Sequence, residues 1–156
     1  MESKEREDGE VAMAARPSLS QVNLVVTDVE ATVAFYRRLG LEPRDGPPEW
    51  RSHHVTFPMP GGLDLEVDST AFAKEWNRDA VSVARGAVVL GFDVESREEV
   101  DRLCGDLAGA GYRVEQPPYD AFWGARYAVV EDPSGNPVGL MSPVDESQRR
   151  PKPPPP

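Results

Sequence analysis

The alternation of apolar and polar residues predicts that the ordered part of the chain begins with a strand, a helix and three more strands. Within residues 21–27, Val22, Leu24 and Val26 fall on one face of an extended segment. Asp28 follows at a helix N-cap position, ahead of apolar residues at helical spacing that a glycine ends. Three short strands are then expected, around 41–44, 50–57 and 63–67.

The second half of the chain repeats this order. Apolar residues alternate from Val88 to Val94, which predicts a strand, and Ser96 stands at the N-cap of a helix that carries Leu103 and Leu107 on one face. Because a small duplicated unit of this kind cannot cover both faces of its own sheet, each half needs the other. Three further strands are expected around 112–115, 125–131 and 138–141, the last two joined by the tight turn 132–136.

These patterns predict an α+β protein built from two tandem βαβββ modules. The polar N-terminus lacks periodicity and the C-terminal RRPKPPPP cannot enter a helix or sheet interior, so both ends are expected to be disordered. Between the modules, Phe72 and Trp76 stand four residues apart and are expected to pack a weakly helical linker onto the sheet. The predicted parts are an N-terminal tail 1–18, a first module 19–69, a linker 70–84, a second module 85–143 and a Pro-rich tail 144–156.

The composition narrows the class of protein. A length of 156 residues allows one ordinary domain or two fused small modules, and the net charge of −10 repels a phosphate backbone, so we expect no nucleic-acid partner. The same charge attracts a cationic small molecule. No apolar run approaches the roughly 20 residues of a membrane helix, and the single cysteine excludes an internal disulfide. We therefore expect a cytoplasmic protein without a membrane partner.

Short motifs recur in the same order and spacing in both halves. They are NLVVTD (23–28), AFY (34–36), LDLE (63–66), GFDV (91–94), AGY (110–112) and, above all, DPSGN (132–136). These motifs resemble those of the vicinal oxygen chelate superfamily, which includes glyoxalase I, the bleomycin-resistance proteins, fosfomycin-inactivating enzymes and extradiol dioxygenases. Residues 123–127, WGARY, are similar to the bleomycin-resistance branch in particular. The resemblance implies that the two modules form a cup-shaped mixed sheet, and that two copies pair as a homodimer sharing the site.

The resemblance also implies four metal-ligand positions, one on each of four strands that line the cup. In this chain they fall on Gln21, Glu66, Val89 and Gly139. Glu66 is a competent ligand and Gln21 a weak neutral donor, whereas Val89 and Gly139 have no donor atom. We therefore expect no metal ion and no other cofactor. At Gly139 we expect open space in the cup, where a glutamate of the family projects.

An atypical metal site stays open as an alternative. His53 and His54 are adjacent on a predicted strand, so their side chains point to opposite faces and cannot hold one ion together. An unconventional ligand such as His54, Asp64 or Asp93 would be needed to complete such a site.

Strand alternation predicts which side chains line the cup. Aromatic residues gather in the second half, and amide, imidazole and carboxylate groups in the first, which is typical of a site for a flat organic ligand. Aromatic faces beside carboxylates also favour a cation or a nitrogen-rich heterocycle. The expected ligand-binding residues are Gln21, Asn23, Trp50, His54, Glu66, Tyr119, Phe122, Trp123, Tyr127, Val129 and Met141.

The sequence therefore predicts a metal-independent small-molecule-binding protein of the glyoxalase/bleomycin resistance type. It would bind an aromatic or cationic compound and confer antibiotic resistance by sequestration. The first alternative is a metal-dependent glyoxalase-like lyase, isomerase or dioxygenase with an atypical site. The second is a metal-free enzyme with Glu66 as general base and His54 as acid. A structural or regulatory dimer with a filled cup is the third.

Overall fold

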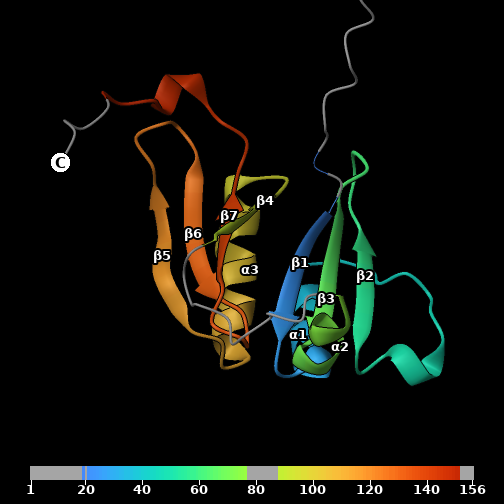
Figure 1. Ribbon diagram of the computed structural model, residues 1–156. Helices are drawn as coiled ribbons and strands as arrows, with labels where there is room; N and C mark the ends of the chain where they lie inside the picture. The colour runs from blue at the N-terminus through green and yellow to red at the C-terminus, as the bar shows by residue number, and fades with distance from the viewer. Residues whose placement is uncertain (1–18, 20, 77–87, 152–156) are drawn as a thin grey trace, which may run out of the picture.

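The computed structural model describes residues 19, 21–76 and 88–151, and each half of this part carries its own sheet (Figure 1). In the first half, β1 runs parallel to β3, and β2 pairs with β3 antiparallel, giving the strand order β1-β3-β2. The helix after β1 begins as expected, because Asp28 Oδ1 accepts a hydrogen bond from the Ala31 N–H at 2.9 Å. The elements are β1 (Gln21–Val26), α1 (Val29–Arg38), the 3₁₀ helix η1 (Pro48–Trp50), β2 (His54–Pro58), β3 (Asp64–Ser69) and α2 (Thr70–Trp76).

The second half repeats the order strand, helix and further strands, with the strand β5 in the place where the first half has the 3₁₀ helix η1. β4 runs parallel to β7, and the strand order is β4-β7-β6-β5. Ser96 caps the helix, its Oγ accepting from the Glu99 N–H at 3.1 Å. The elements are β4 (Leu90–Asp93), α3 (Arg97–Gly109), β5 (Val114–Asp120), β6 (Arg126–Glu131) and β7 (Pro137–Met141). The α+β class and the duplicated architecture are thus confirmed.

The first half departs from the prediction where β5 has its counterpart. Residues 41–44 form no strand, and their backbone link to the sheet is a hydrogen bond of 2.8 Å from the Arg44 N–H to the Thr56 C=O. The strand expected over 50–57 begins only at His54. Prolines at 43, 47 and 48 explain both corrections, because proline has no N–H to give a strand ladder and is favoured at the start of a helix, here η1.

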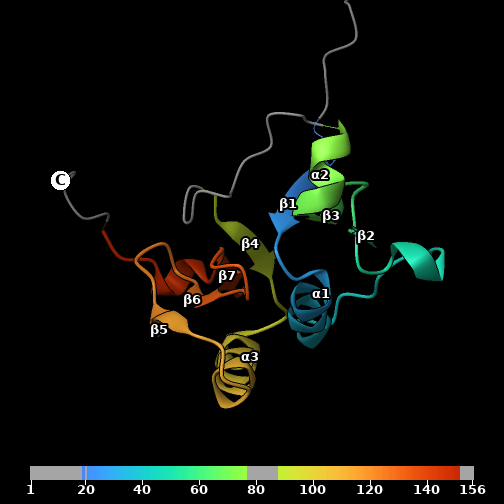
Figure 2. The same ribbon diagram turned by 60° about the horizontal axis from the view of Figure 1, so that its bottom comes forward.

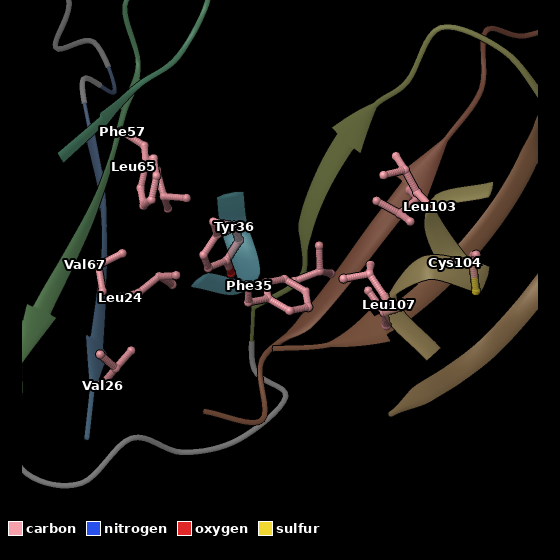
Figure 3. Close-up of a cluster of buried hydrophobic side chains, with 14 of the residues drawn as sticks. Leu24, Val26, Phe35, Tyr36, Phe57, Leu65, Val67, Leu103, Cys104 and Leu107 are labelled. Atoms are coloured by element: carbon pink, nitrogen blue, oxygen red, sulfur yellow. The ribbon is translucent and has the colours of Figure 1, made fainter. Parts of the chain in front are cut away.

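One hydrophobic core runs through both modules. Figure 3 shows Phe35 and Tyr36 of α1 between the apolar side chains of the first sheet and Leu103 and Leu107 of α3. All four are buried. The ring of Phe35 meets that of Tyr112 edge-on, with centroids 5.0 Å apart. Figure 2 shows α1 and α3 on the same side of the molecule. The remaining face of each sheet is therefore left to form the site.

A buried hydrogen bond also ties the modules together. The Tyr36 hydroxyl donates to Asp132 Oδ2 at 3.0 Å. Asp132 Oδ1 meanwhile accepts from the backbone N–H groups of Ser134 and Asn136, both at 2.9 Å, which shapes the predicted turn. Burial, reinforced by the charge of Asp132, raises the pKa of Tyr36 far above its usual range.

The C-terminal segment is ordered further than expected. Residues 144–151 contain the 3₁₀ helix η2 (Glu146–Gln148), and the Arg150 N–H donates to the Phe122 C=O at 2.7 Å. The prediction that residues 144–151 are disordered is therefore wrong, because backbone hydrogen bonds to the loop 121–124 hold this segment in place. The tail residues 1–18 and 152–156 lie outside the described residues. The predicted linker begins with α2, and the side chain of Trp76 lies outside the described part.

None of the helices in the described ranges combines the length and the apolar character that crossing a bilayer requires.

Candidate functional site

The face of each sheet turned away from its helix, called here the cup face, holds most of the residues that the sequence predicts to bind a ligand. On the opposite face, Leu24, Val26, Phe57 and Val67 belong to the core, so the alternation predicted for β1 and β2 is confirmed. By strand register the cup face of the first sheet holds Gln21, Asn23, Val25, His54, Thr56, Asp64, Glu66 and Asp68. That of the second holds Gly91, Asp93, Gln116, Tyr119, Tyr127, Val129, Gly139 and Met141.

The registers also show which cup-face positions of the two modules correspond. In the first sheet Glu66 of the central strand pairs with Asn23 and with Thr56. In the second, Gly139 occupies the same place, between Gly91 and Val129. Two residues further along the central strands, the pair formed by Asp68 and His54 in the first sheet corresponds to the pair formed by Met141 and Tyr127 in the second. The four family ligand positions are therefore two equivalent pairs, Gln21 with Val89 and Glu66 with Gly139.

A chain of polar contacts covers the cup face of the first module. Asn23 receives a hydrogen bond from Gln21 at 2.9 Å and donates one to Asp68 at 2.8 Å. Thr56 donates to Glu66 Oε2 at 2.6 Å. Asp68 is fully buried and Glu66 is 7% exposed. Buried carboxylates are tolerated only with such partners, so these contacts hold both in one orientation.

His54 lies at the centre of this chain and connects its two carboxylates. Its Nδ1 is 2.6 Å from Asp68 Oδ1, and because a carboxylate only accepts, Nδ1 carries a hydrogen and donates it to Asp68. Its Nε2 is 3.5 Å from Glu66 Oε2 and 3.4 Å from Thr56 Oγ1. The ring of Phe72 packs edge-on against the imidazole at a centroid distance of 5.3 Å. The general base and acid named in the second alternative thus stand side by side.

The cup face of the second module and the loop before β6 carry aromatic rings instead. Trp123 meets Phe122, Tyr127 and Tyr119 at centroid distances of 5.2, 5.5 and 6.4 Å, all in edge-to-face geometry. Burial, with a smaller contribution from Tyr119, raises the pKa of the Tyr127 hydroxyl, so it stays protonated at neutral pH. This aromatic cluster is an apolar wall with phenol and indole groups at its surface.

Ionic contacts hold the loop that carries the aromatic cluster. Asp120 is approached by Arg97 at 2.5 Å and by Arg126 at 3.2 Å. Hydrogen bonds from these two arginines lower the pKa of the Asp120 carboxyl. Gly124 is needed here because its backbone φ is +94° and a Cβ at this position would stand 2.5 Å from the Asp145 carbonyl oxygen. The C-terminal segment therefore packs directly against the loop.

Gly139 does not leave the open space that we expected. A Cβ at this position would lie 2.5 Å from the Tyr127 hydroxyl oxygen and about 3 Å from two ring carbons. The phenol of Tyr127 thus occupies the volume into which a longer side chain at 139 would project. The prediction of an opening is corrected, because the neighbouring strand supplies a large side chain where β7 supplies none.

The four family ligand positions do not fit a divalent cation. Val89 is 53% exposed and, like Gly139, has no donor atom. The Gln21 amide is already bonded to Asn23, and Glu66 is bonded to Thr56. Among the described residues, no group of three or more His, Cys, Asp and Glu side chains is arranged to hold a metal ion. A single carboxylate and one amide are a poor donor set for such an ion.

Trp50 lies apart from the cup face. It belongs to η1, is 44% exposed, and packs against Phe72 at a centroid distance of 5.1 Å. It helps to line a cavity of about 730 Å³ between α1, the loop 43–51 and β2, into which His54 and Thr56 also face. The prediction that Trp50 lines the cup is therefore wrong. It rested on a strand over residues 50–57, whereas the prolines start a 3₁₀ helix that contains Trp50.

The structure gathers the predicted residues into two groups. Gln21, Asn23, His54 and Glu66 form one, and Tyr119, Phe122, Trp123 and Tyr127 form the other; no ring contact or side-chain hydrogen bond joins the groups within the described ranges. Val129 and Met141 share the cup face of the second group by register. Asp68 belongs to the first group as well, although it is not among the predicted residues. The available signal was its position two residues after Glu66, which puts both side chains on the same face of one strand.

Cys104 lies outside both groups, on α3. It is buried, and burial together with the nearby charge of Asp101 raises the pKa of its thiol. A thiol in this state is a small apolar side chain of the core rather than a nucleophile.

Solved structures with the same fold support this description. A glyoxalase-related enzyme from Fulvimarina pelagi superposes with a TM-score of 0.71 at 23% identity, covering 81% of this chain and 88% of that one. A glyoxalase/bleomycin resistance protein/dioxygenase family enzyme from Burkholderia phytofirmans PsJN gives 0.69 at 24% identity, with 81% and 98% covered. A lactoylglutathione lyase from Agrobacterium tumefaciens superposes with a TM-score of 0.61 at 22% identity, covering 83% of this chain and 96% of that one. At such identities the likeness concerns the fold.

The sequence comparison places the chain in a family. No curated protein matches it. The family model described as Glyoxalase/Bleomycin resistance protein/Dioxygenase superfamily matches residues 18–140, which include every described strand except the last residue of β7. Together with the duplicated strand–helix–strand topology, this match shows that the chain belongs to the glyoxalase/bleomycin resistance protein/dioxygenase superfamily.

Proposed function

We propose that this protein binds an aromatic or cationic small molecule on its cup face without a metal ion, in the manner of the bleomycin-resistance branch that residues 123–127 resemble. The observation that carries the proposal is the Tyr127 phenol in the place where position 139 would supply a ligand. A side chain that fills this volume replaces a metal-binding wall with an aromatic one. The protein then has a surface suited to stacking and apolar burial.

The two halves of the cup face support the choice of ligand. The aromatic cluster offers ring faces and edges for a flat compound. The first module contributes Glu66 and Asp68, held in place by hydrogen bonds, with His54 between them. A cationic or nitrogen-rich group would find acceptors there, and the net charge of −10 favours its approach.

We also propose that the protein is a cytoplasmic homodimer. By sequestering the compound it would confer antibiotic resistance without catalysing a reaction. Sedimentation velocity on the full chain tests the dimer. A monomer at every concentration up to that in the cell would contradict a shared site.

Calorimetric titration tests the binding. The probes are metal-free bleomycin and proflavine, a flat aromatic cation, in a buffer with EDTA. We expect at least one of them to bind in the micromolar range, and Trp123→Ala to weaken it about tenfold through lost stacking. Tyr119→Ala, at a position that is 36% exposed, repeats the test with little risk to folding. Trp50→Ala is the comparison variant, because Trp50 contacts no ring of the aromatic cluster and lines the cavity beside His54 instead. Weakening by Trp50→Ala but not by Trp123→Ala would place the ligand in that cavity and contradict stacking on the aromatic cluster.

Two results would contradict the proposal. One is the absence of binding by either probe, with the Trp123→Ala variant changed only in stability. The other is stoichiometric zinc, nickel, manganese or iron in protein purified without chelators, which would favour the metal-dependent enzyme.

The contacts of His54 favour a second candidate, a metal-free enzyme that moves a proton. Asp68 orients the imidazole through Nδ1, and Nε2 faces Glu66 at 3.5 Å, so a base and an acid meet at one point of the cup face. Exchange of solvent deuterium into the carbon-bound protons of methylglyoxal and dihydroxyacetone, followed by proton NMR, tests it. Exchange that His54→Phe abolishes would support this candidate. No exchange above buffer would leave the binding protein as the function.

A further inference from the structure

A groove lies where the two modules meet, away from the aromatic cluster and the His54 contacts. β1 and β4 are the terminal strands of their sheets and do not pair with each other in the described structure, so the seam between the sheets is open. The groove there has a volume of about 850 Å³, within the range of sites for drug-sized ligands. Both modules supply its apolar walls, which include Leu41, Met59, Leu63, Val89 and Phe92.

The charged groups that line this seam groove all have the same sign. They are Glu42, Asp64 and Asp93, and no lysine, arginine or histidine of the described chain lines it. Asp64 is compensated by Arg44, at 3.5 Å. Glu42 and Asp93 are exposed and form no ion pair with a described residue. The cavity beside Trp50 differs, because Arg37, Arg44 and Arg51 line it.

We propose that the seam groove binds a lipophilic organic cation, such as a quaternary ammonium or phosphonium compound. Its apolar body would displace water from the leucine, methionine and phenylalanine side chains, and its charge would lie near Glu42 and Asp93. Apolar burial supplies most of the affinity, and the carboxylates select the sign of the charge. Asp64, Gly91 and Asp93 belong both to the lining of this groove and to the cup face by register, but no residue of the aromatic cluster and none of the His54 contacts lines it. The proposal therefore does not depend on the function proposed for the aromatic cluster.

A pair of probes with the same size and opposite charge tests the proposal. Tetraphenylphosphonium and tetraphenylborate are titrated into the full chain and followed by calorimetry and by backbone amide NMR shifts. We expect the cation to bind with a dissociation constant of about 10–100 µM and to shift the amides of Leu41, Val89 and Gly91. Equal or tighter binding of the anion would overturn the proposal, as would shifts confined to the aromatic cluster.

Charge-neutralising variants assign the sign selection to the groove. E42Q/D93N alters two exposed side chains, and we expect it to weaken tetraphenylphosphonium binding about five- to tenfold. E98Q/E115Q is the matched control: it removes the same charge from two exposed positions outside the groove, and we expect less than about a twofold change. Equal weakening by both pairs would mean that only the overall charge of the protein acts, and would overturn the proposal.

Two further measurements separate this site from other uses of the groove. Trp123→Ala is expected to leave tetraphenylphosphonium binding unchanged, so the failure of one proposal does not carry the other with it. Val89→Arg places a positive charge in the groove at an exposed position and is expected to abolish binding of the cation. If Val89→Arg instead dissociates a dimer and the wild-type chain binds no cation, a second copy occupies the groove and the proposal is wrong.

Discussion

The two modules share their strand registers but carry opposite chemistry on the cup face. Where the first module has Glu66 bonded to Thr56, the second has Gly139 beside Val129, and where the first pairs His54 with Asp68, the second pairs Tyr127 with Met141. The core-facing positions of both modules remain apolar. The difference teaches that burial constrains one face of each sheet, whereas the other face is free to change its chemistry within the same backbone.

The modules also differ at one edge. β5 completes the second sheet, whereas the corresponding segment of the first module leaves β2 as an edge strand with one backbone hydrogen bond to Arg44. The cavity beside Trp50 lies at this edge. A duplicated fold thus acquires a cavity in one copy because prolines prevent a strand there.

Restoring the family carboxylate in the second module should have the largest effect. We expect Gly139→Glu to lower the free energy of unfolding by about 3 kcal/mol, because the new side chain must displace the Tyr127 ring. Gly91→Ala is the matched control: this glycine pairs with Gly139, and a Cβ there has no neighbour within 4 Å. Urea unfolding measures both. Equal losses for the two variants would show that the phenol does not block position 139.

The bond between the modules should rank next. Tyr36→Phe removes a buried donor to Asp132, and we expect a loss of about 2 kcal/mol in urea unfolding at neutral pH. Because the folded-state pKa of Tyr36 is raised, the native chain keeps this proton when the unfolded chain loses it, near pH 10. The contribution of this proton to the free energy of unfolding is therefore fully present below pH 10. Above that pH the free energy of unfolding falls, by up to about 1.4 kcal/mol per pH unit.

The alkaline part of that prediction has its own control. Tyr36→Phe should make the decline above pH 10 shallower, whereas Tyr112→Phe leaves the buried hydroxyl in place and should keep it. An unchanged slope in Tyr36→Phe would mean that other groups cause the alkaline loss.

Exchanging equivalent residues of the two cup faces should give a smaller and asymmetric result. Thr56→Val removes the 2.6 Å hydrogen bond to Glu66, and we expect a loss of about 1.5 kcal/mol because the acceptor is a buried carboxylate. Val129→Thr adds a hydroxyl beside Gly139, which has no side-chain acceptor, and should not compensate. Thermal unfolding of the two single variants and of the double variant Thr56→Val/Val129→Thr measures these changes in stability. Equal and opposite effects would contradict the difference between the faces.

The helix caps should show the smallest effect, and the same effect in both modules. Asp28→Ala and Ser96→Ala each remove one side-chain acceptor for a backbone N–H, and we expect about 1 kcal/mol for each. Chemical unfolding measures the two losses side by side. A difference larger than about 1 kcal/mol would mean that the repeats are not equivalent even where their sequences serve the same purpose.

Most of the fold could be predicted from local patterns. The caps at Asp28 and Ser96, the glycine that ends α1 and the alternation in β1, β2 and β6 are each carried by neighbouring residues. The failures at 41–44, at Trp50 and at 144–151 have another origin. Proline removed a strand in the first two cases, and contacts with the distant loop 121–124 ordered the third.

The candidate site was predicted less completely. Alternation found His54 and Glu66 on one face, but not that Asp68 and Thr56 would join them in one set of contacts. Gly139 and Tyr127 are read correctly as members of one face, yet that they compete for the same volume depends on the pairing of β6 with β7.

The order of side chains along the chain determined the class of fold, the duplication and the absence of donors at Val89 and Gly139, because periodicity and atom type are local properties. The tertiary structure decided that a phenol fills the place of the missing ligand, that one imidazole connects two carboxylates, and that a groove lined by acids opens between the modules. Each of these depends on distances between residues far apart in sequence, which register and packing set and which no local pattern encodes.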